Sequence, residues 1–96
     1  MKLSVIIPVY NEAATVQEIA RRVDAVKLSL NRELILVDDA STDGTRDILK
    51  KMAAEHPEWT FVCHDVNRGK GAAIRSGLAA TTGDIVVVQD ADLEYD

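Results

Sequence analysis

Two aspartates near the end of the sequence, Asp90 and Asp92, have the residue type and spacing to bind a divalent cation. In an extended segment residues i and i+2 point to the same side, so both carboxylates would face one point, with small Ala91 between them. Carboxylate oxygens suit hard cations such as Mg²⁺ or Mn²⁺, which usually share phosphate oxygens of a substrate. The spacing alone fits solvated acids in a turn equally well, so its meaning depends on the preceding element.

Asp38 and Asp39 form a second acidic pair, which follows the apolar run ending at Val37. Asp39 could accept a hydrogen bond from a nucleobase N–H or from a ribose hydroxyl, and we favour that interpretation. For the next residues, Ser41 to Asp43, we favour capping of a following helix.

The first apolar run ends in a third polar cluster. Pro8 would stand at the end of a strand, where its missing N–H costs little. Tyr10 offers a flat ring on which a base could stack, and Glu12 could reach a sugar hydroxyl or the base. The alternative is that Asn11 and Glu12 only begin a helix.

Residues 67–71, Asn-Arg-Gly-Lys-Gly, form the fourth cluster, and their spacing is not that of a phosphate-binding P-loop. We favour a flexible loop that enters a helix; the functional alternative places Lys70 or Arg75 near a diphosphate. Three further candidate ligands lack ligand spacing and are interpreted as structural or solvent-exposed: His56, Cys63 and His64.

Four short apolar runs predict the strands that carry these clusters: 3–9, 34–37, 60–63 and 85–88. Three of the runs have no polar alternation, which is typical of parallel strands covered on both faces. The run at 60–63 looks more like an edge strand.

Three segments between the runs, 14–28, 45–56 and 70–81, have apolar residues at helical spacing. Pro57 ends the second, and Gly77 in the middle of the third indicates close packing against the sheet. The order βαβαβαβ predicts an α/β, Rossmann-like fold with a four-stranded, mostly parallel sheet and helices on both faces.

In such a sheet ligands bind beyond the carboxyl ends of the strands, where all four polar clusters would lie. This placement favours the metal-binding interpretation of Asp90 and Asp92 over a solvated turn.

Composition excludes several other classes of protein. The chain has 96 residues, enough for one small domain, and its net charge of −5 argues against non-specific nucleic-acid binding. One cysteine allows no intrachain disulfide, which fits a reducing compartment. No signal peptide and no apolar run of membrane-spanning length is apparent.

Five segments in register resemble family 2 of the inverting glycosyltransferases, which have a GT-A fold: 4–12, 37–45, 67–73, 83–84 and 89–93. Within that family the strongest resemblance is to the dolichyl- and polyprenyl-phosphate sugar transferases, such as the dolichol-phosphate mannosyltransferases. It covers essentially the whole chain, and each motif alone is modest.

The resemblance implies transfer of a sugar, with inversion, from a UDP- or GDP-linked donor to an acceptor such as a polyprenyl phosphate. Nucleotide contacts are implied for Pro8, Tyr10, Glu12, Val37 and Asp39. The diphosphate and a Mg²⁺ or Mn²⁺ ion would be bound by Asp90, Ala91 and Asp92, with the metal on the two aspartates.

Proteins of this family usually run to more than twice this length. We therefore expect residues 1–96 to form the nucleotide-sugar-binding N-terminal part, with acceptor contacts and any catalytic base beyond Asp96. We expect a cytoplasmic protein, held at the cytoplasmic face of a membrane through such a later part.

Three alternatives remain. The first is a truncated module that binds nucleotide and metal without turnover. A response-regulator receiver would need its acidic pair after the first strand, whereas Asp38 and Asp39 follow the second. A sugar nucleotidyltransferase would have a Gly-rich basic loop after the first strand, where this chain has residues 8–12.

Overall fold

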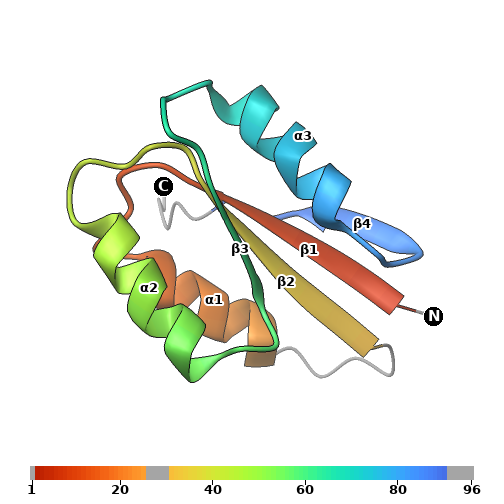
Figure 1. Ribbon diagram of the computed structural model, residues 1–96. Coiled ribbons are helices and arrows are strands. Elements are labelled where there is room, and N and C mark those ends of the chain that lie inside the picture. Colours follow the sequence, from red (N-terminus) through yellow and green to blue (C-terminus); the bar gives the residue numbers. More distant parts are fainter. Residues whose placement is uncertain (1, 26–30, 91–96) are drawn as a thin grey trace, which may run out of the picture.

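The computed structural model describes residues 2–25 and 31–90, which alternate between strands and helices (Figure 1). The elements follow in the order β1 (Lys2–Val9), α1 (Val16–Ala25), β2 (Asn31–Asp38), α2 (Thr45–Glu55), β3 (Thr60–Cys63), α3 (Lys70–Ala80) and β4 (Ile85–Val88). The predicted βαβαβαβ order is confirmed. No helix among these elements is long and apolar enough to span a bilayer.

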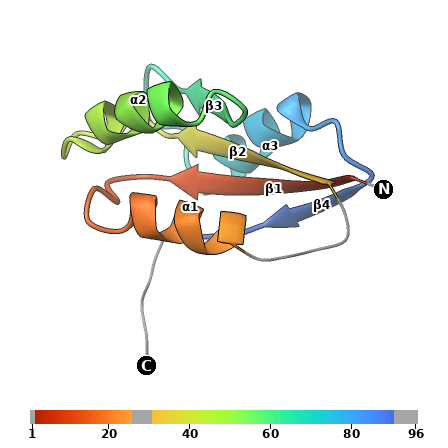
Figure 2. The same ribbon diagram turned by 90° about the horizontal axis from the view of Figure 1, so that it is seen from below.

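The four strands form one sheet in the order β3-β2-β1-β4, and every neighbouring pair is parallel (Figure 2). β1 pairs with β2 from Lys2 opposite Asn31 to Val9 opposite Asp38. The two central strands therefore end level with each other, and the polar residues after each of them emerge side by side. β3 is an edge strand, as its sequence predicts.

Alternating residues of the central strands face two separate cores. One face of the sheet packs against α1 and α2, with Val5, Ile7 and Val9 buried among their side chains. The other face packs against α3, with Ile6 and Ile35 fully buried. Helices therefore cover both faces of the central strands, which explains why both strands are apolar at nearly every residue.

Gly77 allows α3 to lie close to β1. A Cβ atom at this residue would come within 2.6 Å of Cγ2 of Ile6, closer than two carbon atoms can approach. The predicted close packing of the helix against the sheet is confirmed, and it accounts for a glycine that otherwise weakens a helix.

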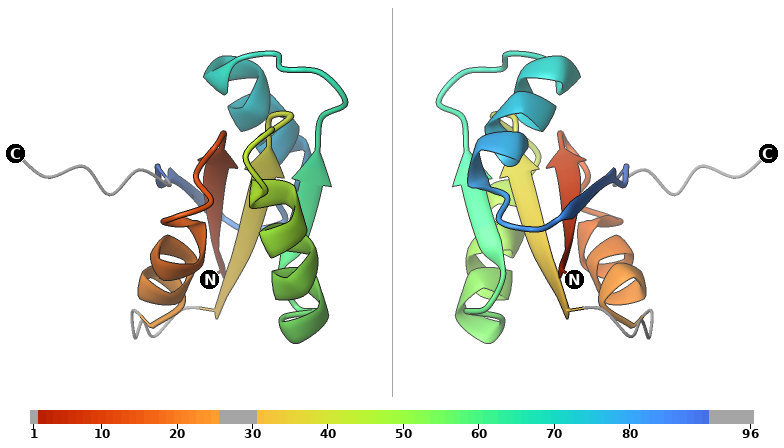
Figure 3. Two further views of the ribbon diagram at one scale, coloured as in Figure 1. Left: turned by 90° about the vertical axis from the view of Figure 1, so that its left-hand side faces the viewer. Right: turned by 90° about the vertical axis from the view of Figure 1, so that its right-hand side faces the viewer.

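Within the described residues the fourth strand is not covered on both faces, in contrast to the prediction. Ile85, Val86, Val87 and Val88 are each 39–43% exposed. β4 is the edge strand beyond β1, and none of the three described helices lies over it (Figure 3). An apolar sequence predicts a strand whose two faces are both suited to burial. It does not identify the helix or strand that packs against each face.

The helices are shorter than predicted. α1 begins at Val16 instead of Ala14, and residues 26–28 of its predicted end lie outside the described residues. α2 ends at Glu55 and α3 at Ala80, each one residue early.

A polar network at the amino ends of the strands attaches β4 to the sheet. Glu33 accepts hydrogen bonds from the Ser4 hydroxyl and from the Thr82 N–H, the latter at 2.6 Å, while the Gly83 N–H donates to Ser4 Oγ at 2.9 Å. Burial would raise the pKa of Glu33, but these hydrogen bonds and the charge of Lys2 outweigh burial and lower its pKa.

Candidate functional site

A pocket of about 480 Å³ lies at the carboxyl ends of the strands. Its lining comes from the ends of β1, β2 and β4 and from the loop that enters α3, and consists of Pro8, Val9, Tyr10, Glu12, Asp39, Asn67, Gly69, Lys70 and Asp90. The four polar clusters that the sequence predicts at this edge thus contribute to one pocket.

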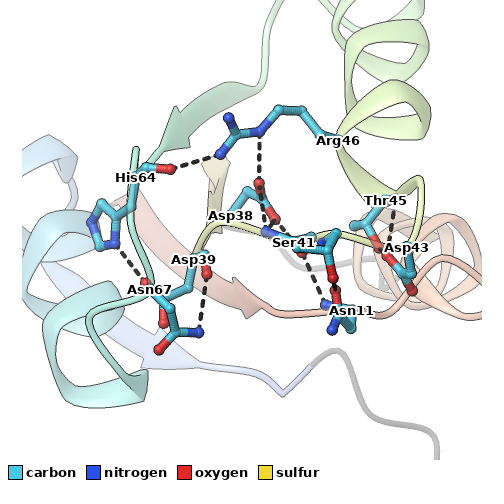
Figure 4. A network of polar contacts seen from close by, with 10 residues as sticks. Asn11, Asp38, Asp39, Ser41, Asp43, Thr45, Arg46, His64 and Asn67 are labelled. Carbon is cyan, nitrogen blue, oxygen red and sulfur yellow. Dashed lines mark hydrogen bonds and ion pairs between the residues drawn. The ribbon is translucent and has the colours of Figure 1, made fainter.

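Hydrogen bonds join the loops that follow β1 and β2. The Asn11 N–H donates to Ser41 Oγ at 2.9 Å, and Asn11 Oδ1 accepts from the Thr42 N–H at 2.8 Å (Figure 4). Asn11 and Ala40 both adopt positive φ angles, 51° and 63°, which non-glycine residues rarely do. Strained backbone held by surrounding contacts is common where a loop must present side chains in one arrangement.

The two aspartates at the end of β2, Asp38 within the strand and Asp39 directly after it, have different surroundings. Asp38 is fully buried and accepts hydrogen bonds from the Ser41 hydroxyl and from Arg46 Nε, the latter at 3.0 Å. The other end of the Arg46 guanidinium donates to the main-chain oxygen of His64 at 2.7 Å. Asp38 therefore holds the loop and α2 in place, and Asp39 is the member of the pair that lines the pocket.

Asp39 accepts three hydrogen bonds on its carboxylate. The Arg68 N–H donates to Oδ1 and the Gly69 N–H to Oδ2, each at 2.8 Å, and His64 Nδ1 lies 2.9 Å from Oδ1. Burial would raise the pKa of Asp39, but these hydrogen bonds and the nearby imidazole lower it. The pocket therefore contains a firmly held, ionised acceptor.

Of the residues 41–43 for which the sequence favours capping, Asp43 supports the start of α2, although the N-cap residue itself is Gly44. Ser41 and Thr42 instead bond to Asp38 and Asn11. Asp43 Oδ1 accepts from the N–H of Thr45, the first residue of α2, at 3.1 Å, and its Oδ2 accepts from the Ala13 N–H at 3.2 Å. The hydrogen bond with the Thr45 hydroxyl is the main cause of a lowered Asp43 pKa. The residue therefore stabilises the start of α2 and lies outside the pocket lining.

Asp90 is the described part of the predicted metal site. It lines the pocket with about half of its side chain exposed, and its carboxylate pairs with the ammonium of Lys70 at the start of α3. Lys70 thus reaches the pocket, as the functional alternative for its loop requires, whereas Arg75 does not line it.

The surroundings of Asp90 fit a cation bound by few protein ligands. The Lys70 ammonium pairs with the Asp90 carboxylate, so a metal ion would bind there in exchange for this ion pair. Within residues 2–25 and 31–90 no three acidic, histidine or cysteine side chains cluster around one point. Mg²⁺ and Mn²⁺ are typically bound in this way with a nucleotide, through one or two carboxylates and substrate phosphates.

The structure brings five of the predicted site residues together in the pocket: Pro8, Tyr10, Glu12, Asp39 and Asp90. Val37 is fully buried against α3 and does not line the pocket. Ala91 and Asp92 lie outside the described residues.

His64 is the residue of the site that the sequence did not reveal. It is buried beside Asp39, whereas its lack of ligand spacing indicated only a structural or exposed residue. The available signal was its place directly after β3, at the same edge of the sheet as the polar clusters. Asn67 also contributes, since its Nδ2 donates to the main-chain oxygen of Asp39 at 3.2 Å.

The sequence profile of glycosyl transferase family 2 matches residues 4–96. Among curated proteins, the chain is 43% identical over 96 residues to the undecaprenyl-phosphate 4-deoxy-4-formamido-L-arabinose transferase of Pseudomonas syringae pv. syringae (strain B728a). That match covers 96% of this chain and 28% of the relative. The chain thus spans under a third of the relative's length.

Two solved structures extend the comparison. The mannosyltransferase PcManGT from Pyrobaculum calidifontis, in complex with GDP-Man and Mn²⁺, superposes with a TM-score of 0.82 at 37% identity, over 94% of this chain and 27% of that one. Glucosyl-3-phosphoglycerate synthase from Mycobacterium tuberculosis, in complex with Mn²⁺, UDP and glucosyl-3-phosphoglycerate, gives 0.75 at 35% identity, over 97% and 34%.

Proposed function

Because the chain belongs to glycosyl transferase family 2, we propose that the pocket at the carboxyl edge of the sheet binds the nucleoside diphosphate of a nucleotide-sugar donor. One observation carries the proposal: the ends of β1, β2 and β4 place an aromatic ring, an ionised carboxylate and an acid paired with a lysine around one pocket. The ring and the carboxylate suit the base of such a donor, and the acid paired with a lysine suits its charged diphosphate.

In this proposal the nucleoside lies between β1 and β2. The half-exposed ring of Tyr10 stacks on the base, and Asp39 accepts a hydrogen bond from a base N–H. Pro8 and Glu12 complete the contacts, with Glu12 facing a sugar hydroxyl or the base. Val37, one residue before the aspartate pair, supports the base indirectly because its side chain lies in the core.

The diphosphate lies toward Asp90 and Lys70. We propose that Asp90 and Asp92 would hold Mg²⁺ or Mn²⁺, with Ala91 among the residues that contact the diphosphate; the Mn²⁺ in the two similar structures supports this. When bound there, the metal would supply positive charge that offsets the negative charge on the leaving nucleoside diphosphate. Lys70 adds a second positive group if its ammonium leaves Asp90 and pairs with the phosphate oxygens of the donor.

The acceptor is a polyprenyl phosphate in this proposal, supported by the name of the Pseudomonas relative. Residues 1–96 then serve as the donor-binding N-terminal part of a longer enzyme, with the catalytic base and the acceptor contacts outside them. A lipid acceptor would place the reaction at a membrane surface.

Titration calorimetry with UDP and GDP, with and without Mn²⁺, tests donor binding. We expect the native chain to bind weakly without Mn²⁺ and more tightly with it. With Mn²⁺ present, Asp90→Asn should weaken binding about tenfold, since a metal ligand is lost. Asp65→Asn is the matched control, because it removes the same charge from an exposed residue at the same edge of the sheet. Metal-independent binding that Asp90→Asn leaves unchanged would refute the proposed site.

A second measurement, turnover of the donor, distinguishes an enzyme from the alternative, a module that binds nucleotide and metal without turnover. Donor hydrolysis or sugar transfer by the purified chain, abolished by Asp92→Ala, would exclude a binding-only role. Nucleotide binding without turnover is expected under both hypotheses, because the proposal places the catalytic base outside these residues.

A further inference from the structure

His64 connects the pocket carboxylate to α3. Its side chain is 8% exposed and lies directly after β3, where its own N–H donates to the main-chain oxygen of Asp38 at 2.8 Å. Nδ1 lies 2.9 Å from Asp39 Oδ1, and Nε2 lies 2.7 Å from the hydroxyl of Ser76 on α3 (Figure 4 shows the contact with Asp39).

The direction of these hydrogen bonds follows from the chemistry of the three groups. An ionised carboxylate can only accept, and the lowered pKa of Asp39 keeps it ionised at neutral pH. Nδ1 of His64 must therefore carry a hydrogen and donate it to Asp39. When the ring is neutral, Nε2 is an acceptor and the Ser76 hydroxyl donates to it, so Ser76 favours the tautomer that Asp39 requires.

The hydrogen bonds also determine how many acceptor positions Asp39 has left. Each carboxylate oxygen has two lone pairs. Oδ1 uses both, for His64 Nδ1 and the Arg68 N–H, whereas Oδ2 uses one, for the Gly69 N–H. No further hydrogen bond to Oδ2 is present among residues 2–25 and 31–90, so one acceptor position of this pocket-lining carboxylate is left for a ligand.

We propose that His64 and Ser76 are positioning residues that set the base preference of the pocket. By occupying Oδ1 they restrict Asp39 to a single acceptor, which suits a base edge with one N–H between two carbonyl groups, as in uracil. A guanine edge presents two adjacent N–H donors and needs both carboxylate oxygens. The proposal rests on the proposed function, since it assumes that Asp39 faces the base of a nucleoside diphosphate.

The matched variants come from the chain itself. His64→Leu removes both ring contacts at similar size, His64→Asn keeps a donor near the Nδ1 position, and Ser76→Ala removes only the group that orients the ring. His56→Gln is the control, because His56 is the other histidine of the chain and does not line the pocket. Its Nδ1 also lies near a carboxylate oxygen, that of Glu58, at 3.5 Å.

Calorimetry with UDP and with GDP, each with Mn²⁺, measures the preference. We expect the native chain to bind UDP at least tenfold more tightly than GDP. His64→Leu should weaken UDP binding about tenfold and reduce the preference, and His64→Asn should restore most of it. Ser76→Ala should weaken UDP binding about threefold in the native background and have no effect when His64 is leucine, as expected for a residue that acts through the ring.

The failures are distinguishable. A native chain that binds neither nucleotide contradicts the proposed function itself. UDP binding that is unchanged in His64→Leu, as in His56→Gln, or a native preference for GDP, overturns the positioning role alone. If His64→Leu does not fold, as judged by circular dichroism, Ser76→Ala decides: a preference equal to the native one overturns the proposal.

Discussion

Carboxyl groups that are buried usually titrate above their ordinary range, yet Asp39 and Glu33 both have lowered pKa values. Each accepts several hydrogen bonds from groups that are fixed by the fold, and these bonds favour the charged form more strongly than burial disfavours it. The same contacts that orient the two side chains therefore make the stability of the protein depend on pH.

The sign of this dependence follows from linkage. Because the pKa of Glu33 is lower in the folded chain than in the unfolded one, its stabilisation is complete above about pH 4.3 and is lost as the pH falls through the folded value. We expect the free energy of unfolding, measured with urea, to fall between pH 5 and pH 3. Glu33→Gln should lower stability at pH 7 and flatten this fall, whereas Glu18→Gln, on an exposed helix surface, should leave the fall as steep as in the native chain.

Ala40 has a left-handed backbone, with φ of 63°, directly after Asp39. A residue with a Cβ pays roughly 1–2 kcal/mol for this conformation, whereas glycine adopts it freely. We expect Ala40→Gly to raise the free energy of unfolding by about 1 kcal/mol in urea titrations. The same exchange in a helix, Ala53→Gly in α2, should lower it by about 1 kcal/mol; equal losses at both residues would contradict strain at Ala40.

Sequence and structure differ most clearly at this residue scale. Tyr10, Asp39 and Asp90 were predictable, because the carboxyl ends of parallel strands meet at one edge. The role of His64 was not predictable, because it depends on which strands are neighbours in space: β3 lies beside β2, so the residue after β3 meets the residue after β2.

At the scale of elements, the close packing of α3 against β1 depends on Gly77. The space between Gly77 and Ile6 has no room for a methyl group. Gly77→Ala gains helix propensity of about 1 kcal/mol but forces the helix and strand apart, and overpacking of this kind costs roughly 1–3 kcal/mol. We expect net destabilisation in urea unfolding.

Gly71 provides the comparison within the same helix. A Cβ there would meet only the end of the Arg75 side chain, at 3.6 Å. Gly71→Ala should therefore keep the gain in propensity and stabilise the protein by up to about 1 kcal/mol. If both substitutions stabilised the protein, α3 and β1 could move apart at Gly77 without a loss of free energy of unfolding, which would contradict the prediction.

The elements themselves were largely predictable, because apolar runs and helical spacing report local structure. The exception is the cover over β4, which depends on the arrangement of the whole sheet. Residues 85–88 have the same apolar character as the central strands, but β4 lies at the edge, where none of the described helices packs against it.

At the scale of the whole molecule, this exposed apolar edge has a physical consequence. Four consecutive β-branched residues on an edge strand form a template for pairing with another strand, and β4 carries no charge or proline that would oppose it. We expect this chain to associate with itself as its concentration rises, which sedimentation velocity would detect. Val87→Lys should reduce association strongly.

Gln17→Lys is the matched control, since it adds the same charge to an exposed residue of α1. If both substitutions reduced association equally, net charge and not the edge strand would be responsible. If the native chain did not associate at any accessible concentration, the exposed edge of β4 would not act as a template for strand pairing, and the prediction would be wrong.

The pairing of β1 with β4 also bears on the order in which the chain folds. Leu3 pairs with Ile85, close to opposite ends of the described sequence, whereas β1 and β2 are separated only by α1 and its loops. Closing the longer loop costs more chain entropy, so β1, α1 and β2 can assemble first and β4 can join an existing sheet. Asp90 follows this last strand. The pocket at the carboxyl edge of the sheet would then be completed in the final step of folding, after the hydrogen bonds of Asp39 have formed.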